Sequence, residues 1–418
     1  MKESRSLEFK SQVTKGFLKT VSAFANFGGG TILFGIDDSG TPIGIEDPSA
    51  SCLDIENRIN DVFDPRPDFS LNINKDRTVA LVVEDGFDKP YLCNGKAYRR
   101  SDTSTVEVDK LELRRLVLAG QNLDFDEVPC HIDSLSFTQL ESMLKESVGI
   151  NSLTDDTLRT LGLLGKDGYN NAAAILADSN SFPGVDIAVF GEDEDTILDR
   201  AQVNKKSVLE SFARAMEFYE SRCCYEKING TLRDKIETVP RKAFRETLAN
   251  ALVHRAWDVS APVRIAIKPG TVEVLSPGGL VFGMSVKTYL DGRYSMLRNP
   301  ILAEVFFRLG IIEKFGTGIA RIKRAYAGTG NKPSFEVEDD FICVTLPVIT
   351  GTAPQKTPNE DEQLVLSKMP RYQLITRSAI DKAVGFEKAK TIRILNSLES
   401  KGLIKANGRG RARKYVRM

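Results

Sequence analysis

The chain has 418 residues, of which 41% are hydrophobic and 27% are charged, and its 57 basic and 57 acidic side chains give a net charge of zero. These values are ordinary for a globular protein of two to four domains, and they exclude binding of a polyanion through overall charge alone. No apolar run reaches the ~18 residues that span a bilayer, the N-terminus lacks the apolar core of a signal peptide, and the six cysteines form no CxxC pair. We therefore expect a cytoplasmic protein with reduced thiols and no membrane partner.

Strand and helix patterns predict a mixed α/β (α+β) fold in several domains. Residues 1–118 and 236–349 alternate strand-like and helical segments, and 119–235 place two amphipathic helices around a central strand. Residues 350–360 are rich in Pro and Thr and predict a linker, followed by a compact helical module over 361–418.

The first strand-like stretch, ESRSLEFK, contains an unusual number of charges. On a strand, Leu7 and Phe9 face the core while Glu8 and Lys10 share the other face. A helix over residues 15–26 follows and ends at a triple glycine, and the strand TILFGI then leads to Asp38. We expect this strand–helix–strand unit to bring Glu3, Glu8 and Asp38 (or the adjacent Asp37) together beside Lys10.

Three carboxylates and a lysine suit a Mg²⁺ or Mn²⁺ site for phosphodiester cleavage, with the acids as metal ligands and Lys10 offsetting charge on the phosphate. Two other interpretations stay open. The cluster is a nucleic-acid-binding surface without cleavage, or Glu3 and Glu8 are solvated strand residues and Asp38 only forms a turn. At a later strand, Arg99 and Arg100 follow Tyr98 and predict phosphate or base contacts, or else form a plain charged surface.

The stretches ESRSLEFK and SAFANFGGGTILFGIDDSGTPIG resemble the signature of the Schlafen-type AlbA-like domain. In eukaryotic Schlafens, the two glutamates and the aspartate of this signature form a nuclease centre for transfer and ribosomal RNA. By this resemblance the centre is Glu3, Glu8 and Asp38. Many bacterial relatives are described only as transcriptional regulators, and eukaryotic Schlafen cores carry two tandem copies where this chain has one. A comparable RNA clamp would therefore require dimerisation.

In the middle of the chain, RETLANALVHRAW places Glu246 and Asn250 one turn apart on a predicted helix. Such a pair suits a magnesium-bound nucleotide, and Gly316-Thr317-Gly318 before a later helix presents backbone N–H groups to phosphate. In the alternative interpretation, the pair makes hydrogen bonds on the helix surface and the glycines form a tight turn.

The segments RETLANALVHRAW, VEVLSPGGL and RNPILAEVFFRLGIIEKFGTGI resemble the C-terminal domain of bacterial regulators labelled "RecG-like helicase", divergent relatives of the GHKL ATPases. The resemblance implies an α/β sandwich and ATP as a cofactor, held by Glu246, Asn250, Gly316, Thr317 and Gly318. Residues 276–279 (SPGG) stand where the family has the adenine-reading aspartate, which counts against ATP turnover. The chain has no GxxxxGK[ST] loop, which excludes a P-loop helicase motor.

The C-terminal module reads as three short helices followed by a basic hairpin around Asn407-Gly408, the pattern of a winged helix–turn–helix. Residues 401–418 contain seven lysines and arginines and no acid, so we expect strongly salt-dependent DNA binding. The alternative is a dimerisation module with a solvated charged tail. The residues expected to contact DNA lie on the third helix and the hairpin: Lys388, Lys390, Arg393, Asn396, Arg409, Arg411, Arg413 and Lys414.

Three functions therefore follow from the sequence. The first is a DNA-binding transcriptional regulator, with ligand- or nucleotide-sensing N-terminal and middle domains and a homodimeric state matching two-fold sites. The second is a metal-dependent nuclease acting on RNA or DNA, in phage or stress defence, and the third is an interaction scaffold without enzymatic activity.

Overall fold

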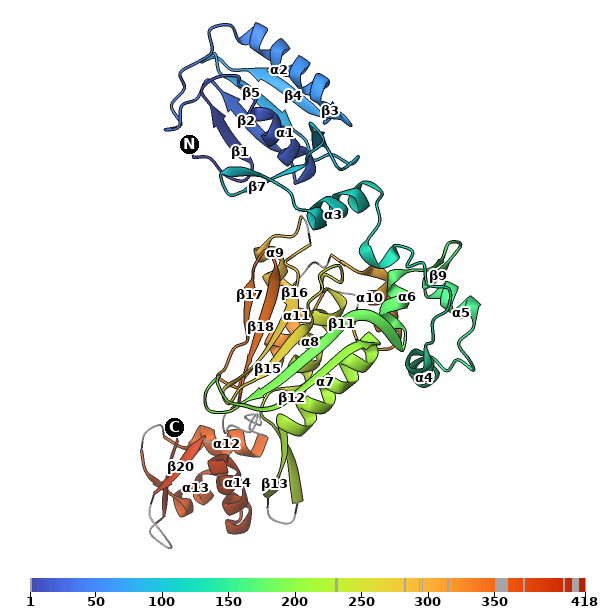
Figure 1. Cartoon of the computed structure of the whole chain (residues 1–418). Helices are drawn as coiled ribbons and strands as arrows, with labels where there is room; N and C mark the ends of the chain where they lie inside the picture. The colour runs from blue at the N-terminus through green and yellow to red at the C-terminus, as the bar shows by residue number, and fades with distance from the viewer. Residues whose placement is uncertain are drawn as a thin grey trace.

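The computed structural model describes residues 2–229, 232–281, 283–292, 294, 296–313, 316–349, 360–370, 373–400, 403–407 and 413–417. Within these residues the chain forms an N-terminal domain, a central domain and a C-terminal module, each around its own hydrophobic core (Figure 1). The mixed α/β class predicted from the sequence is confirmed.

The N-terminal domain is built on a four-stranded sheet of order β1-β2-β5-β4, in which only β1 and β2 are parallel. Helix α1 connects those two strands and contacts β2 and β5 as well as β6, β7 and β8, which explains why nearly all its residues are buried. The elements of this domain and the helix that leaves it are β1 (Leu7–Lys10), α1 (Phe17–Asn26), β2 (Gly30–Phe34), α2 (Pro48–Val62), β3 (Phe63–Asp64), β4 (Phe69–Ile73), β5 (Val79–Val83), β6 (Leu92–Cys93), β7 (Tyr98–Ser101), β8 (Ser104–Glu107) and α3 (Lys110–Gly120).

Two polar residues of α1 hold the chain that leads into β7. Asn26 donates to the Tyr91 carbonyl oxygen at 2.9 Å and accepts from the Tyr91 N–H at 2.8 Å. Ser22, one turn earlier, donates to the same carbonyl at 2.8 Å and accepts from the Tyr98 N–H at 3.2 Å. Because both side chains are buried, each of these hydrogen bonds satisfies a group that water does not reach. The position of β7 against α1 is thereby set.

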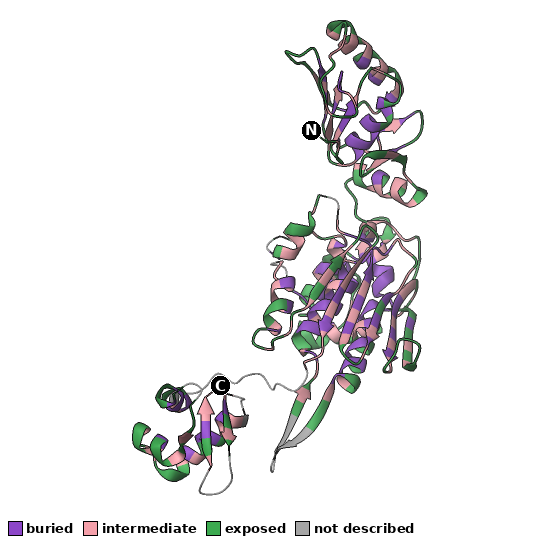
Figure 2. Ribbon diagram, turned by 90° about the vertical axis from the view of Figure 1, so that its left-hand side faces the viewer, coloured by how far each residue is buried: buried purple, intermediate pink, exposed green. Residues whose placement is uncertain are grey.

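The central domain is a six-stranded sheet of order β12-β11-β15-β16-β18-β17, with α7 and α8 packed against it (Figures 1 and 2). Its elements are the 3-10 helix η1 (Phe125–Glu127), α4 (Thr138–Ser147), α5 (Asp155–Thr160), β9 (Leu164–Gly165), β10 (Gly168–Tyr169), α6 (Asn171–Leu176), β11 (Ser179–Phe190), β12 (Ile197–Lys206), α7 (Val208–Arg222), β13 (Cys224–Asn229), β14 (Leu232–Glu237), α8 (Arg241–Val253), β15 (Val263–Ile267), β16 (Thr271–Pro277), α9 (Val286–Asp291), α10 (Pro300–Arg308), α11 (Gly318–Ala325), β17 (Ser334–Val337) and β18 (Phe341–Pro347).

The boundary that the sequence analysis placed between residues 235 and 236 falls inside this unit. Strand β11 pairs in parallel with β15, with Val185 opposite Val263, and one hydrophobic core extends from Phe137 to Leu346. The segments 119–235 and 236–349 therefore share one sheet and one core. Local periodicity did not reveal this because the pairing joins strands that are far apart in the sequence.

A buried carboxylate connects the start of this domain to α10. Asp126 is fully buried, and its Oδ2 accepts hydrogen bonds from the backbone N–H groups of Ile301 at 2.9 Å and Leu302 at 3.0 Å. These N–H groups belong to the first turn of α10, where the helix has no partners of its own for them and where its dipole favours negative charge. Burial is nevertheless the larger effect, and it raises the pKa of Asp126 to about 7.

The C-terminal module packs three helices against a three-stranded sheet of order β19-β21-β20, around Leu395, Leu398 and Ile380. Its elements are α12 (Glu360–Lys368), β19 (Ile375–Thr376), α13 (Arg377–Val384), α14 (Lys388–Ser400), β20 (Ile404–Asn407) and β21 (Lys414–Arg417). The predicted linker falls almost entirely outside the described residues. In the described part of the chain, no helix combines the length and apolar character needed to cross a bilayer.

The burial of Asp126 predicts a pH dependence of stability. Because the folded state holds its proton more tightly than the unfolded state does, the contribution of Asp126 to stability is complete below about pH 4 and is lost as the pH rises through about 7. Between about pH 5 and pH 8, we expect the free energy of unfolding of the wild-type protein to decrease more than that of Asp126→Asn. The two decreases should differ by about 1 kcal/mol or more. Urea denaturation followed by the fluorescence of Trp257, the single tryptophan, measures this in the central domain. Asp133→Asn, a change at an exposed position, serves as the control. If the free energy of unfolding of Asp126→Asn depends on pH as it does in the wild type, the interpretation is contradicted.

Candidate functional site

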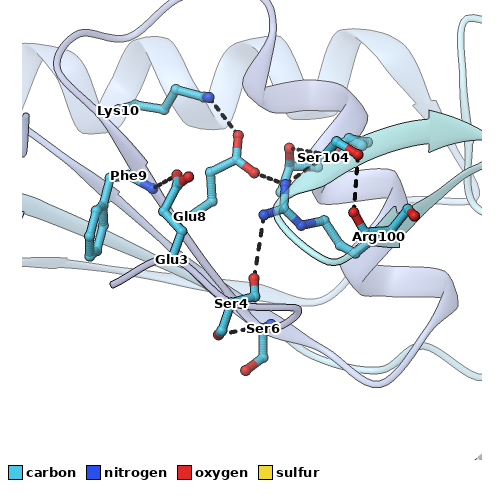
Figure 3. A network of polar contacts seen from close by, with 11 residues as sticks. Glu3, Ser4, Ser6, Glu8, Phe9, Lys10, Arg100 and Ser104 are labelled. Carbon is cyan, nitrogen blue, oxygen red and sulfur yellow. Dashed lines mark hydrogen bonds and ion pairs between the residues drawn. The ribbon is translucent and has the colours of Figure 1, made fainter. Parts of the chain in front are cut away.

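The Glu8 carboxylate lies between two cations in the N-terminal domain (Figure 3). Its Oε1 is 2.5 Å from Lys10 Nζ, which confirms that the two residues share one face of β1, and its Oε2 is paired with Arg100 Nη1. The side chains of Glu8 and Arg100 are only 6% and 5% exposed. Both oxygens of this carboxylate are therefore occupied by positive groups in a place that is almost closed to water.

Arg100 is positioned from β7 by contacts around its guanidinium group. Nη1 also donates to Thr105 Oγ1 at 3.0 Å, Nη2 donates to the Ser4 carbonyl oxygen at 3.4 Å, and the guanidinium lies 6.0 Å from the centre of the Phe24 ring. Hydrogen bonds of Asn26 and Ser22 in α1 with the backbone of Tyr91 and Tyr98 fix the position of β7, the strand that carries Arg100. Arg100 was predicted to contact phosphate, but here a phosphate reaches its guanidinium only if the pair with Glu8 opens.

The other two predicted acids have different surroundings. Glu3 lies beside Glu8 in Figure 3, and its Oε1 accepts a hydrogen bond from the Phe9 N–H at 2.9 Å. Asp38 is exposed beyond the end of β2, and among the described residues it forms no metal-holding group with Glu3 and Glu8. The turn is instead organised by Asp37, which accepts from the Ser39 N–H, the Ser39 hydroxyl and the Thr41 N–H. The hydrogen bond from the Ser39 hydroxyl is the main reason that the pKa of Asp37 is lowered.

This arrangement does not fit a divalent metal ion at the predicted acids. No group of three or more His, Cys, Asp or Glu side chains is placed to hold a metal among the residues that the structure describes. The oxygens of Glu8 that would ligate the ion already pair with Lys10 and Arg100. Metal-dependent cleavage by Glu3, Glu8 and Asp38 stays a prediction, and it requires a rearrangement of this cluster.

The second predicted cation of β7 faces the helix that leaves the domain. Arg99 Nε lies 3.1 Å from Glu112 Oε1 of α3, and the Arg99 side chain is 37% exposed. Arg99 is therefore more accessible to a nucleic-acid phosphate than Arg100. Its first role in this structure is to join the β7–β8 hairpin to α3.

In the central domain the structure brings together three of the residues predicted to bind a nucleotide. Gly318 opens α11 directly against Glu246 and Asn250 of α8, so closely that a Cβ at Gly318 would lie 2.8 Å from Glu246 Oε1 and 2.8 Å from Asn250 Nδ2. Glu246 is buried, and its Oε2 lies 3.7 Å from Arg321 Nη1. Burial raises the pKa of Glu246, while Arg321 acts in the opposite direction.

Gly316 and Thr317, the other two residues of the predicted phosphate-binding turn, come just before that contact. Gly316 has a positive φ of 63°, and Thr317 precedes the first turn of α11. Because α11 packs directly on Glu246 and Asn250, this arrangement has no space between them for a metal-bound phosphate. The SPGG turn also serves packing, since Ser276 donates to the Ala251 carbonyl oxygen at 2.8 Å and a Cβ at Gly278 would lie 2.6 Å from Ala256 Cβ. ATP binding therefore stays a prediction that needs α11 to move.

The cations predicted to contact DNA differ in their surroundings. Lys388, Arg393 and Asn396 are exposed on α14, and Lys414 is exposed on β21. Lys390 is 2.9 Å from Asp361 Oδ2 and lies over the Phe386 ring, and Arg413 Nη2 is 2.6 Å from Glu399 Oε2. Lys390 and Arg413 are therefore neutralised within the module. Arg409 and Arg411 lie outside the described residues.

Two family models match parts of this chain. Residues 3–109 match the family model described as "Schlafen, AlbA_2", and residues 260–346 match the model described as "Putative ATP-dependent DNA helicase recG C-terminal". The chain thus combines a Schlafen AlbA_2 domain with a RecG C-terminal-type domain, as the sequence motifs indicated. No curated protein matches it. The crystal structure of the DIP2311 protein from Corynebacterium diphtheriae aligns with 99% of this chain and 92% of its own at 21% identity, with a TM-score of 0.48.

Sequence reasoning did not find the residues that hold these sites in place. Ser22 and Asn26 lie within the SAFAN motif at helical spacing, which could have indicated a shared contact but not the backbone of Tyr91 as its target. Arg255 is fully buried and donates to the carbonyl oxygens of Pro183 and Ala261. A charged residue just after a largely apolar helix is a signal for such a role, but one of its partners, Pro183, is 72 residues away in the chain.

The burial of the Glu8 pair predicts a large effect of removing its negative charge. In Glu8→Gln, the buried Arg100 loses its counter-charge in a place almost closed to water, and we expect the N-terminal domain to lose about 3 kcal/mol of stability. In the control Glu3→Gln, the amide oxygen still accepts from Phe9, and we expect a change within about 0.5 kcal/mol. Differential scanning calorimetry measures both, and equal losses would contradict a special role for Glu8.

The engagement of Glu8 also predicts the response to metal. We expect millimolar Mn²⁺ to leave the melting temperatures of the wild-type protein unchanged. An ion that bound only the folded state would raise them, and more so the tighter it bound. The Glu3→Gln, Glu8→Gln double variant is the control for binding elsewhere. A rise of the melting temperature in the wild type that the double variant lacks would show that the acids rearrange to form a metal site.

Proposed function

We propose that this protein is a DNA-binding transcriptional regulator whose C-terminal module provides the principal contact with DNA. The two matched domain models associate the chain with nucleic acids. The cluster around Glu8 is internally neutralised, and the pair Glu246 and Asn250 is covered by α11. Among the described residues of the C-terminal module, Lys388, Arg393 and Lys414 are exposed cations available to a polyanion.

The order of elements in the module supports the proposal. Helix α12 is followed by β19, helices α13 and α14, and the strand pair β20 and β21, and the sheet has the order β19-β21-β20. A winged helix–turn–helix has this succession, with its third helix in the major groove and the hairpin between its last two strands as the wing. In our proposal α14 is the recognition helix.

The exposed side chains of α14 give the strongest support for the proposal. Arg393 lies on the side of α14 away from Leu395 and Leu398, Lys388 is exposed at the first residue of the helix, and Asn396 is also exposed. Neither cation has a carboxylate partner among the described residues. Cations that no acid neutralises repel one another until a polyanion approaches, and an exposed asparagine can read the edge of adenine. The N-terminal and central domains would set the oligomeric state and sense a ligand. A homodimer would match the two-fold sites that such modules commonly read.

The contacts of α14 predict that Lys388 and Arg393 contribute more to DNA affinity than Lys390 does. In Lys388→Gln with Arg393→Gln, we expect weaker binding to a fluorescein-labelled duplex of mixed sequence and a salt dependence reduced by about one unit of slope for each lost phosphate contact. In the control Lys390→Gln, we expect at most about a twofold change, because Asp361 already neutralises that lysine. Fluorescence anisotropy across a series of salt concentrations measures both.

An affinity and slope that stay unchanged in the double variant would overturn the assignment of α14 as the recognition helix. Equal losses in the double variant and in Lys390→Gln would show that the module binds through overall charge rather than through this face.

A further inference from the structure

A cleft separates α3, the helix that leaves the N-terminal domain, from the central domain. Its volume is about 770 Å³, within the range of roughly 300–1,000 Å³ in which proteins hold small molecules. One wall is the α3 face that carries Lys110 and Arg114, and the other is formed by Phe125, Phe182 and Trp257. In Figure 1, α3 lies between the N-terminal sheet and the central sheet. We name this space the α3 cleft.

The central wall of the α3 cleft is a fixed aromatic surface. The Phe182 ring packs edge-to-face against Trp257, with centroids 5.7 Å apart, and against Phe125 at 6.2 Å. The buried Arg255 lies 4.2 Å from the centre of the Trp257 ring and donates to the Pro183 carbonyl oxygen at 2.6 Å. Because these contacts hold the rings in one arrangement, the wall offers an apolar surface that needs little ordering when a ligand binds.

The opposite wall carries an excess of positive charge. Lys110 and Arg114 are four residues apart on α3, so they lie on one face, and both are exposed. Neither has an acidic partner among the described residues. Arg115 also lines the cleft, but Asp258 neutralises it through two hydrogen bonds of 2.6 and 2.9 Å. The lining therefore has two uncompensated cations opposite an aromatic surface.

We propose that the α3 cleft binds a small aromatic acid, with its ring against the partly exposed Phe125 and Phe182, which pack over the buried Trp257, and its acidic group at Lys110 and Arg114. A purely apolar ligand would leave the two cations unused, and a small inorganic anion would leave the aromatic wall exposed. The ligand would contact α3 and the central domain at once. Since α3 is joined to the β7–β8 hairpin through Glu112 and Arg99, the site connects the N-terminal domain to the central domain.

The probe for this site is 8-anilinonaphthalene-1-sulfonate, an aromatic sulfonate that fluoresces in apolar surroundings. Trp257 is the single tryptophan of the chain and lines the cleft, so energy transfer from tryptophan to the probe reports binding near this site. With the full-length wild-type protein, we expect a saturable transfer signal. The neutral analogue N-phenyl-1-naphthylamine should bind at least about fivefold more weakly, because it lacks the group that pairs with the cations.

Two variants and a matched control test the walls separately. Lys110→Gln with Arg114→Gln should weaken binding of the sulfonate at least about fivefold and leave the neutral analogue within about twofold. Ser181→Trp places a large side chain in the cleft and should weaken both probes, with total probe fluorescence measuring the affinity because this variant adds a second tryptophan. Lys166→Gln with Lys332→Gln removes the same charge at exposed positions outside the cleft and should leave both affinities within about twofold.

Equal affinity of the wild type for the two probes, or sulfonate binding that survives both the Lys110→Gln, Arg114→Gln change and Ser181→Trp, would overturn the proposal. A loss in the matched control as large as in the cleft variant would overturn it as well, since binding would then follow overall charge. Calorimetry of each variant establishes that it is folded before the titration.

Discussion

The compensation of charge in places closed to water is the constraint on which this structure depends. Glu8, Asp126, Glu246 and Arg255 are each less than 9% exposed, and an ion in such a place is costly unless hydrogen bonds or an opposite charge compensate it. The fold meets the requirement with Arg100 for Glu8, a helix N-terminus for Asp126, Arg321 for Glu246 and backbone carbonyl oxygens for Arg255. For Glu8, Asp126 and Glu246 the compensating group belongs to an element that is distant in the chain, and Arg255 combines the distant Pro183 with the nearby Ala261.

Because of the same constraint, the presence of a sequence motif does not by itself determine what chemistry its residues can perform. The residues of the Schlafen signature are present, and the fold places Glu8 and Lys10 on one face of β1 as expected. Yet the Glu8 carboxylate that would hold a metal is paired with two cations, and among the described residues Asp38 forms no metal-holding group with it. A shared fold alone does not establish a shared reaction, because the reaction depends on which groups surround the carboxylate.

Helix α3 has a position that its sequence does not reveal. Near its start, Glu112 contacts Arg99 of the N-terminal domain, and one turn later Arg115 pairs with Asp258 of the central domain. The bidentate contact with Asp258 raises the pKa of Arg115, which as an arginine is charged under all ordinary conditions. Helix α3 is thus joined to both domains by ion pairs, and the α3 cleft lies along it. A ligand in the cleft that binds one arrangement of the two domains more tightly would favour that arrangement.

Local patterns in the sequence determined the elements and two of the domain families. The alternation in LEFK, the triple glycine after α1 and the helical spacing in RETLANALV each predicted an element that the structure contains, because these signals act over one or two turns or a few strand residues. Only the tertiary structure decided which acids meet which cations. Glu8 and Arg100 are 92 residues apart and Arg115 and Asp258 are 143 apart. Many side chains of suitable charge compete for such partners, and the packing of whole elements selects among them.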